Sequence, residues 1–304
     1  MDGLHNDLCG SFDQSGSEKR QREPGRGVLA KVHGRGTMID ERALTRIPPT
    51  VWPSGSMQHE LPFTSDLEVE RNCLTCPYLA DREAKLVYWL PHGGTRAKDL
   101  DRRLEAGQRR HGPLVYEPQC DGCQQCISLR IPIQNFRMSR SQRRVWTRGQ
   151  KQLVARLGLP TRDQAQLDLI NRHSGWRGWL GAGESISADF YEQVFVCSLF
   201  HSLEISYFVG TKLVGIAICD RGEIGFSAVY TYYDPDFASL SLGTYSVLYQ
   251  LAYCRQLELQ YLYLGYYVAD CPSLMYKANF GPHQRRLGGK WIDMEFNTED
   301  SNRE

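Results

Sequence analysis

The alternation of hydrophobic and polar positions becomes regular only near residue 61. Residues 1–62 are rich in Gly, Ser, Arg and Pro and show neither a helical nor a strand period, so we expect a disordered extension there. From residue 77 to residue 117 the pattern predicts short strands over 85–90 and 114–116. Between these strands it predicts a helix over 98–107, which ends at a glycine.

Two longer strands are predicted in the second half of the chain. Residues 206–220 and 223–233 have the alternation of a β-hairpin, and the Asp-Arg-Gly segment at 220–222 supplies the turn. Asp234 and Pro235 follow the second strand, and a proline at this point ends it.

A helix and a buried strand follow the hairpin. Ser241 is placed to cap a helix over 242–259, and residues 261–268 form an aromatic, apolar run typical of a buried strand. Strand, strand, helix, strand is the core order of an acyltransferase-type sheet. We therefore predict an α/β (α+β) fold with a mixed, acyltransferase-like (GNAT-type) sheet.

The length of 304 residues fits two domains of about 150 residues each. We divide the chain into the extension (1–62), a Cys-containing N-terminal region (63–145) and a C-terminal GNAT-like domain (146–304). Hydrophobic residues make up 41% and charged residues 23%, which excludes wholesale disorder and a coiled coil. No apolar run approaches the roughly 20 residues of a membrane span, and no secretory signal is visible. We therefore expect a soluble, cytoplasmic protein with no membrane partner.

Five of the ten cysteines fall in two clusters, Cys73-x-x-Cys76 and Cys120-x-x-Cys123-x-x-Cys126. A reducing cytosol disfavours structural disulfides, and a two-residue spacing lets two thiolates reach one metal ion. Structural zinc and an iron–sulfur cluster both fit four such ligands. Unligated or redox-active thiols are the alternative, because free cysteine is among the most buried residue types.

The net charge of +1 conceals a long basic block. Residues 122–162 contain no Asp or Glu but nine cations. Such cations bind phosphate backbones, and an aromatic side chain such as Trp146 within the block can stack on an unpaired base. We favour nucleic-acid binding over a merely solvated helical face. The densest cations are Arg140, Arg143, Arg144, Arg148 and Lys151.

Polar aromatic residues are frequent where the predicted hairpin and the last predicted strand end. They are candidates to line a substrate cleft, although core packing is an equally ordinary role for them; they are Tyr230, Tyr232, Tyr233, Tyr266 and Tyr267. Gly243 at the start of the predicted helix is placed to approach a phosphate. A coenzyme A loop would add further glycines and a cation, which argues against an acetyl-CoA enzyme.

Several segments together resemble the N-end-rule aminoacyl-tRNA–protein transferases, most closely the bacterial aspartate/glutamate leucyltransferases, which are relatives of arginyl-tRNA–protein transferase. The matching segments occur in the family's order across roughly residues 61–293. They are CLTCPYL at 73–79, CDGCQQCISLRIP at 120–132, SRSQRR at 139–144, YTYYDPD at 230–236, SLGTY at 241–245, YLGYY at 263–267 and MYKA at 275–278.

The resemblance implies transfer of leucine from leucyl-tRNA to the α-amine of proteins with an N-terminal Asp or Glu, which marks them for degradation. Arginine is the alternative donor. The ester on the terminal ribose is already activated, and the attacking α-amine has a pKa of about 7.7–8.0. Positioning and oxyanion stabilisation then supply most of the rate. We expect no covalent intermediate and no cofactor in the transfer step.

Candidate site residues follow from these demands. For catalysis we predict Lys277, Tyr230 and Asp234. For substrate binding we predict Arg130, which would hold an acidic side chain as Lys277 also could, Tyr266 for the oxyanion or terminal ribose, and Asp236 for the ammonium group. An ordinary ion pair for Arg130, a solvated Lys277, and turn or cap chemistry for the Asp-Pro-Asp segment are the alternatives.

Binding of tRNA is assigned to Arg140, Arg143, Arg144, Arg148 and Lys151. The resemblance also points to Cys73, Cys76, Cys123 and Cys126 as ligands of a structural metal, should one be present. Two other functions compete with the transferase: an acetyl-CoA-dependent N-acetyltransferase on the same fold, and a metal-containing RNA-binding module without catalysis.

Overall fold

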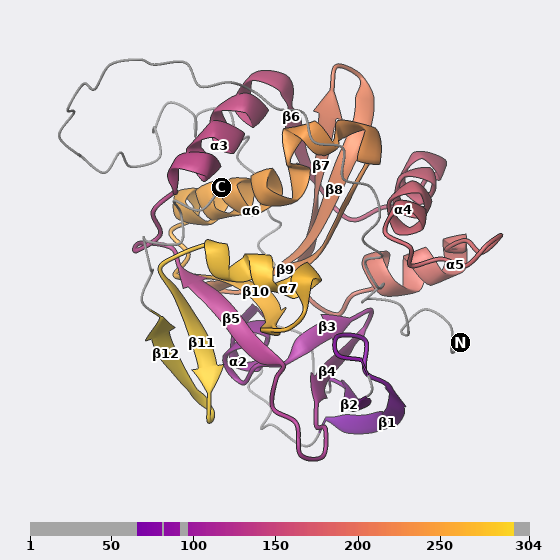
Figure 1. Cartoon of the computed structure of the whole chain (residues 1–304), viewed down its shortest axis with the longest axis vertical. Coiled ribbons are helices and arrows are strands. Elements are labelled where there is room, and N and C mark those ends of the chain that lie inside the picture. The colour runs from indigo at the N-terminus through magenta and orange to yellow at the C-terminus, as the bar shows by residue number, and fades with distance from the viewer. Residues whose placement is uncertain (1–65, 81, 92–96, 295–304) are drawn as a thin grey trace, which may run out of the picture.

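The computed structural model describes residues 66–80, 82–91 and 97–294 of the chain (Figure 1). The predicted disordered extension over 1–62 lies outside the described residues. In chain order the elements are β1 (Leu67–Thr75), β2 (Glu83–Leu90), α2 (Ala97–Glu105), β3 (Arg109–His111), β4 (Leu114–Pro118), β5 (Ile127–Pro132), α3 (Arg140–Gln152), β6 (Val154–Gly158), α4 (Gln164–Trp176), α5 (Ala188–Tyr191), the π-helical η1 (Glu192–Val196), β7 (Ser202–Val209), β8 (Lys212–Arg221), β9 (Gly225–Tyr233), the 3-10 helix η2 (Pro235–Leu240), α6 (Leu242–Gln256), β10 (Tyr261–Tyr267), α7 (Pro272–Met275), the 3-10 helix η3 (Tyr276–Asn279), β11 (His283–Leu287) and β12 (Lys290–Met294).

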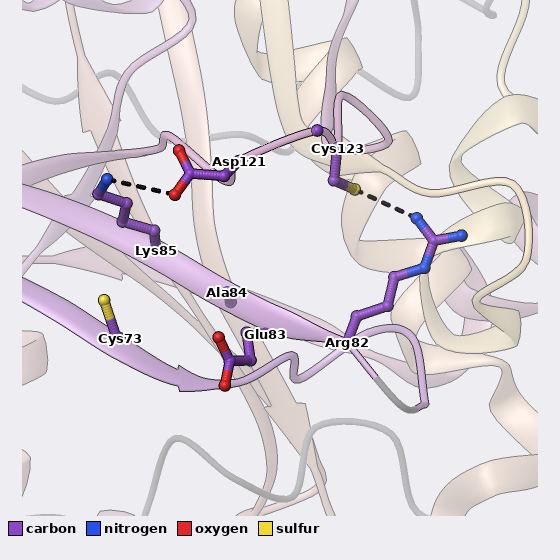
Figure 2. A pocket seen from close by; sticks show the side chains of 8 residues that line it. Cys73, Arg82, Glu83, Ala84, Lys85, Asp121 and Cys123 are labelled. Atoms are coloured by element: carbon purple, nitrogen blue, oxygen red, sulfur yellow. Dashed lines mark hydrogen bonds and ion pairs between the residues drawn. The ribbon is translucent and has the colours of Figure 1, made fainter.

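The N-terminal strands form a small antiparallel sheet in the order β1-β2-β4-β3. The strands predicted over 85–90 and 114–116 are β2 and β4, and the predicted helix is α2, so all three predictions are confirmed. The cysteine clusters lie at one end of this sheet. There Lys85 of β2 forms an ion pair with Asp121 at 3.6 Å (Figure 2).

The second sheet has eight strands in the order β12-β11-β5-β10-β9-β8-β7-β6. All neighbours are antiparallel except β9 and β10, which are parallel. Parallel neighbours need a crossover connection, and α6 provides it. The predicted order of strand, strand, helix and strand is therefore confirmed as β8, β9, α6 and β10. The predicted α/β class with a mixed sheet is also confirmed.

The prediction of a single strand over 206–220 is wrong, because this segment contains parts of two strands, β7 and β8. β7 and β8 form a hairpin that turns at Gly210 and Thr211, where Gly210 has a φ of +59°. The run over 213–219 is apolar because both faces of β8 are buried. Ile216 and Ile218 pack against α4 and α5, and Cys219 packs on the α6 side.

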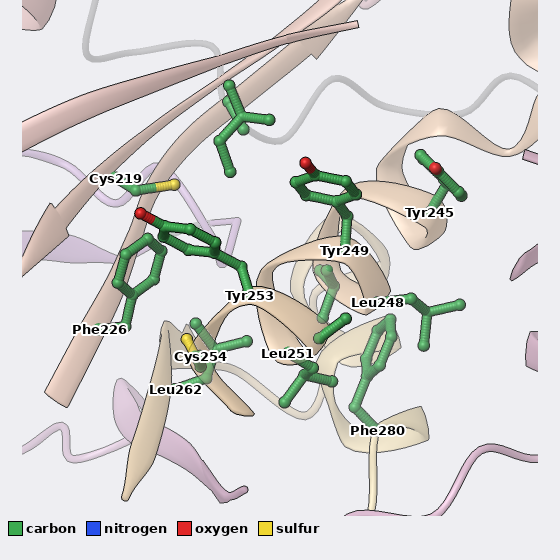
Figure 3. Close-up of a cluster of buried hydrophobic side chains, with 14 of the residues drawn as sticks. Cys219, Phe226, Tyr245, Leu248, Tyr249, Leu251, Tyr253, Cys254, Leu262 and Phe280 are labelled. Atoms are coloured by element: carbon green, nitrogen blue, oxygen red, sulfur yellow. The ribbon is translucent and has the colours of Figure 1, made fainter. Parts of the chain in front are cut away.

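Helix α6 is the centre of the main hydrophobic core. It is buried on almost every side, so its sequence shows little amphipathic pattern. Aromatic contacts join it to the sheet: Tyr249 meets Tyr207 of β7 edge to face at 5.8 Å, and Tyr253 meets Phe226 of β9 at 5.9 Å (Figure 3). Ser241 precedes the helix in a left-handed conformation with a φ of 54°, and its side chain makes no capping hydrogen bond. The predicted side-chain cap is therefore wrong.

Helix α3 covers α6 and carries the densest part of the basic block (Figure 1). A reciprocal capping box begins it: Ser139 accepts from the Gln142 amide, and the Gln142 side chain accepts from the Ser139 amide. Its inner face buries Trp146, which stacks on Tyr245 of α6 at 5.7 Å. A Cβ on Gly149 would stand 2.2 Å from the Tyr245 ring, so only glycine fits this contact.

A buried ion pair joins the small sheet to the large one. The Nε of Arg110 in β3 donates to Asp220 of β8 at 2.7 Å, and both side chains are at most 1% exposed. Ser202 also donates its hydroxyl to Asp220. Nη1 of Arg110 donates to the carbonyls of Gly112 and Val194 at 3.1 Å, whereas Nη2 is buried with no hydrogen-bond partner among the described residues. The additional bonds offset part of the cost of burying the two charges.

The predicted division between residues 145 and 146 falls within α3. Strand β5 precedes that point in sequence, yet it pairs with β10 and β11 in the large sheet. Segments from both sides of the predicted boundary therefore build one sheet. Within the described ranges, no helix combines the length and the apolar character that crossing a membrane requires.

We predict that Gly149→Ala destabilises the protein by about 1–3 kcal/mol, because the added methyl group overpacks the α3–α6 contact. Gly175→Ala in α4 is the matched control, since a Cβ there meets nothing within 4 Å. Replacing an unhindered helical glycine by alanine should stabilise by up to about 1 kcal/mol. Denaturant unfolding of both variants checks the opposite signs, and equal shifts would contradict the packing argument.

Candidate functional site

Lys277 lies inside the protein, not on its surface. It belongs to η3, is only 8% exposed, and donates from Nζ to the carbonyl of Tyr266 in β10 at 2.7 Å. Burial, together with the nearby Arg109 guanidinium, lowers the pKa of Lys277 to about 7. The alternative of a solvated surface lysine is therefore excluded. A lysine with this pKa can hold or release a proton near neutral pH.

Arg109 is the second buried cation of this region. One terminal nitrogen donates to the carbonyl of Ala228 in β9 at 2.6 Å, and the other, Nη1, is buried without a hydrogen-bond partner. The guanidinium lies against Gly265 of β10, where a Cβ would come within 3.3 Å of it and where φ is +86°. Glycine is therefore required at that position.

The sequence analysis missed Arg109. The only signal for it is the run of basic residues Arg109, Arg110 and His111 between two turn glycines. A basic run of this length is typical of a solvent-exposed segment. Burial of both arginines depends on β3 docking against the large sheet, which no local pattern predicts. Neither Arg109 nor Lys277 forms an ion pair with an Asp or Glu in the described part of the chain.

Tyr266 and Tyr230, both predicted site residues, lie on neighbouring strands. Tyr266 is buried next to Lys277, and its hydroxyl donates to the Gly107 carbonyl at 3.2 Å. Tyr230 is half-buried on β9 and packs near Trp179, with ring centroids 6.4 Å apart. Burial raises the pKa of both tyrosines. Both hydroxyls therefore stay protonated at neutral pH and act as hydrogen-bond donors.

The other three tyrosines that are candidates for a substrate cleft differ in burial: one is fully buried and two are half-buried. Tyr232 is fully buried and shares a 2.5 Å hydrogen bond with Tyr191. Tyr267 is half-buried beneath the guanidinium of Arg285, which lies 3.9 Å from its ring centre. Tyr233 is half-buried beside α4. Core packing therefore accounts for Tyr232.

Arg130 lies at the opposite end of β10 and is fully engaged in the fold. Its guanidinium forms a short ion pair with Glu105 of α2 and donates to Tyr263 at 3.0 Å and to Gln284 at 2.7 Å. It also stacks over the rings of Tyr261 and Trp291, at 3.8 and 4.2 Å from their centres. These contacts match the alternative that the sequence left open, an ordinary structural ion pair. Its predicted role in binding an acidic side chain stays a prediction.

Asp234 and Asp236 begin η2. Asp234 is buried and accepts from Arg172 at 2.8 Å, from Lys212 at 2.9 Å and from the Asp236 amide at 3.1 Å. Burial raises the pKa of Asp234, but the Lys212 hydrogen bond, the Asp236 amide and Arg172 outweigh it and lower the pKa overall. Asp236 is exposed and also pairs with Arg172. Turn and cap chemistry therefore describes both carboxylates as they stand.

The predicted tRNA-binding cations form one exposed surface on α3; they are Arg140, Arg143, Arg144, Arg148 and Lys151. No acidic residue lies on the helix. Trp146, expected to stack on a base, is instead buried against α6, so that expectation is wrong. Arg148 donates to the carbonyl of Ser239, which joins α3 to η2.

Two of the predicted metal ligands, Cys73 and Cys123, line a surface hollow of about 380 Å³ beside the small sheet (Figure 2). Cys73 is exposed on β1, and Cys123 accepts a hydrogen bond from Arg82 at 3.5 Å. Cys76 and Cys126 are half-buried. Burial raises the pKa of the Cys126 thiol to about 12, and the neighbouring cysteines add to this rise.

No three His, Cys, Asp or Glu side chains in the described ranges lie close enough together to hold a metal ion. No chemical step of the transfer is therefore assigned to a metal held by Cys73, Cys76, Cys123 and Cys126. Their role as ligands stays a prediction.

Two protein-family models match this chain, one in its N-terminal part and one in its C-terminal part. The model described as "Arginine-tRNA-protein transferase, N terminus" matches residues 74–144, and the model described as "Arginine-tRNA-protein transferase, C terminus" matches residues 166–287. These matches define the chain as an enzyme of the aminoacyltransferase class. It belongs to the arginine-tRNA-protein transferase family, and the resemblance seen in the sequence is confirmed.

Its relatives include proteins named aspartate/glutamate leucyltransferase. The protein from Hahella chejuensis is 36% identical over 217 residues, covering 71% of this chain and 92% of the relative. The proteins from Chromobacterium violaceum and Acinetobacter baumannii strain ATCC 17978 are each 35% identical, and the matches cover 90% and 80% of those relatives.

We predict that Arg130→Lys destabilises the protein by about 2 kcal/mol although the charge is retained, because lysine cannot reproduce the planar fork that reaches Glu105, Tyr263 and Gln284. Arg156→Lys is the control, since Arg156 is an exposed arginine lying 4.5 Å over Phe208. Its effect should stay within about 0.5 kcal/mol. Denaturant midpoints measure both, and equal stability of the two variants would contradict a structural role for Arg130.

Proposed function

We propose that this protein transfers leucine from leucyl-tRNA to the α-amine of proteins that begin with Asp or Glu, and so marks them for degradation by the N-end rule. Membership of the family and the names of the relatives support a tRNA donor and a protein acceptor. The observation that carries the acidic acceptor is the pair of buried cations, Arg109 and Lys277. We place the reaction in the cytoplasm.

Two adjacent buried cations without a carboxylate partner favour an anionic ligand. Burial penalises each charge, and their mutual repulsion lowers the pKa of Lys277 further. A carboxylate placed next to them would relieve both penalties. The buried, unpaired Nη1 of Arg109 supplies a donor for it. The side chain of an N-terminal Asp or Glu brings such a carboxylate, whereas a neutral or basic N-terminal residue does not.

The main contribution of the protein to the transfer reaction is to position the donor ester and the acceptor amine. The α-amine attacks the ester carbon, the C–N bond forms as the bond to the ribose oxygen breaks, and one proton passes from the amine to that oxygen. With the acceptor carboxylate bound, the pKa of Lys277 rises above its value of about 7, so Lys277 stays protonated and positions the acceptor as a cation. Tyr230 is a donor for the developing oxyanion. We propose that the transfer step needs no cofactor.

The donor tRNA is proposed to lie along α3. The five cations of its exposed surface face no acidic residue on that helix, which suits a phosphate backbone. Arginine in place of leucine as the transferred amino acid would use the same surface and the same cation pair. It would change only the pocket for the donor side chain.

The proposal is tested by offering the purified chain labelled leucyl-tRNA or arginyl-tRNA with peptides beginning with Asp, Glu, Lys or Ala. We expect label to move from leucyl-tRNA, and only to the Asp and Glu peptides. Transfer from arginyl-tRNA instead would replace the donor. Absence of transfer from both, with tRNA still bound, would leave an RNA-binding module and overturn the proposal.

We further predict that Arg109→Met lowers kcat/KM for Asp and Glu peptides by about 10- to 100-fold, as expected for the loss of hydrogen bonds to a charged group. Peptides beginning with Asn or Gln provide the matched control, because they keep the shape and lack the charge. The ratio of Asp to Asn transfer should fall towards one in the variant. An unchanged ratio would remove Arg109 from acceptor recognition, even if the overall rate falls.

A further inference from the structure

We propose that the C-terminal end of α4 is a stacking site for the unpaired nucleotide at the 3′ end of the tRNA. This inference rests on the proposed function. The site consists of Trp176, Arg177 and Trp179, with Tyr230, Tyr233 and Tyr276 around them. We call these six residues the aromatic basin.

Two aromatic side chains of the basin are open to solvent, and Trp179, Tyr230 and Tyr233 are half-buried. Trp176 is 50% exposed and Tyr276 is 43% exposed, whereas most large aromatic residues of this protein are buried. Trp176 lies 5.9 Å from Tyr233 and Trp179 lies 6.4 Å from Tyr230, measured between ring centres. Flat, half-exposed rings held close together are the surfaces on which unpaired bases stack.

A cation without a counterion lies among these rings. The guanidinium of Arg177 is 5.0 Å from the centre of the Trp179 ring and 5.8 Å from that of Trp176. Within the described ranges Arg177 forms no ion pair with Asp or Glu. Burial raises the pKa of Tyr233 and Tyr276, and Arg177 acts against that rise, which places its charge near both hydroxyls. Arg177 is half-buried, and its guanidinium, held beside the rings, is available to a phosphate.

His173 fixes the position of the basin on the sheet. Its Nδ1 lies 3.2 Å from the amide and 3.0 Å from the carbonyl of Tyr233, and its ring packs against Trp176, Trp179 and Tyr233. Burial lowers the pKa of His173 to about 4, so the ring is neutral at physiological pH. The end of α4 is therefore held rigidly against β9, and its indoles need little reordering on binding.

The basin lies between the basic helix and the buried cation pair. Helix η2 is bonded to α3 through Arg148 and Ser239, and to α4 through Arg172 and Asp236, so it bridges the tRNA-binding surface and the basin. On the other side, Tyr276 immediately precedes Lys277 in η3. A tRNA arm lying on α3 thus reaches the basin with its terminal nucleotide and the ester next to Lys277.

An aromatic platform with a free guanidinium favours a nucleotide over the leucine side chain of the donor. Leucine would gain from apolar contact but would leave Arg177 without a partner, whereas a nucleotide supplies a base for the indoles and a phosphate for the arginine. The acidic end of the acceptor is already assigned to Arg109 and Lys277. The terminal adenosine of the tRNA is therefore the occupant that matches both the rings and the charge.

The test compares binding of two uncharged tRNAs to the full chain: one with an intact CCA end and one lacking its terminal adenosine. Wild type should bind the intact tRNA about ten-fold more tightly, the expected gain from stacking one base. In Trp176→Leu and in Arg177→Ala this preference should fall towards one. Arg156→Ala, which removes an exposed arginine over Phe208, is the matched control and should keep the full preference.

Several outcomes would overturn the inference. They are an equal preference in wild type and Trp176→Leu, loss of the preference in Arg156→Ala, or no binding of either tRNA. Binding of leucyl-tRNA is measured in a separate arm, and a Trp176→Leu effect seen only there would assign the basin to the amino acid instead. Because the comparison of uncharged tRNAs uses no acceptor and no ester, failure of leucyl transfer would leave its result standing. Thermal unfolding of each variant confirms that the fold is intact.

Discussion

The buried ion pair between Arg110 and Asp220 determines where the chemistry of this protein takes place. It fixes the short strand β3 against the large sheet, with almost no exposure of either charge. Its neighbour in sequence, Arg109, is thereby brought to the carbonyl of Ala228 and into the electrostatic range of Lys277. Without that contact the two cations would be solvated separately, and the proposed recognition of an acidic acceptor would have no structural basis. A buried pair of this kind contributes position more than stability.

The cations on the surface differ in whether an acidic side chain lies next to them. Carboxylates neutralise the cations near η2, where Asp234 and Asp236 hold Arg172 and Lys212, whereas the outer face of α3 and the Arg177 guanidinium have no acidic partner in the described residues. Cations of the first kind maintain the fold, and those of the second kind are free for phosphates. The same distinction separates Arg130, enclosed by Glu105 and aromatic rings, from Arg109 with its unpaired nitrogen.

The sequence predicts the elements whose signal is local. Helix α2, the crossover helix α6 and strand β10 follow from composition and turn residues, and so does the mixed sheet. The sequence predicts poorly those features that depend on contacts between residues far apart in the chain. One long strand over 206–220 is two strands because the turn at Gly210 lies inside a continuous apolar region. Arg130 and Arg109 look alike as basic residues in strands, and only tertiary packing decides which keeps a free donor. Lys277 is likewise buried because it packs against β10, and its neighbours in sequence do not predict this burial.

The position of β5 has a consequence for how the chain is made. This strand precedes the basic helix, yet Ile131 pairs with Leu262 and Arg130 pairs with Gln284, at the far end of the sequence. During synthesis the middle of the large sheet therefore stays open until the last strands leave the ribosome. Such non-local pairing slows folding and exposes strand edges meanwhile. The proposed site takes Arg109 from β3 and Lys277 from η3, so it can form only after both segments have been synthesised.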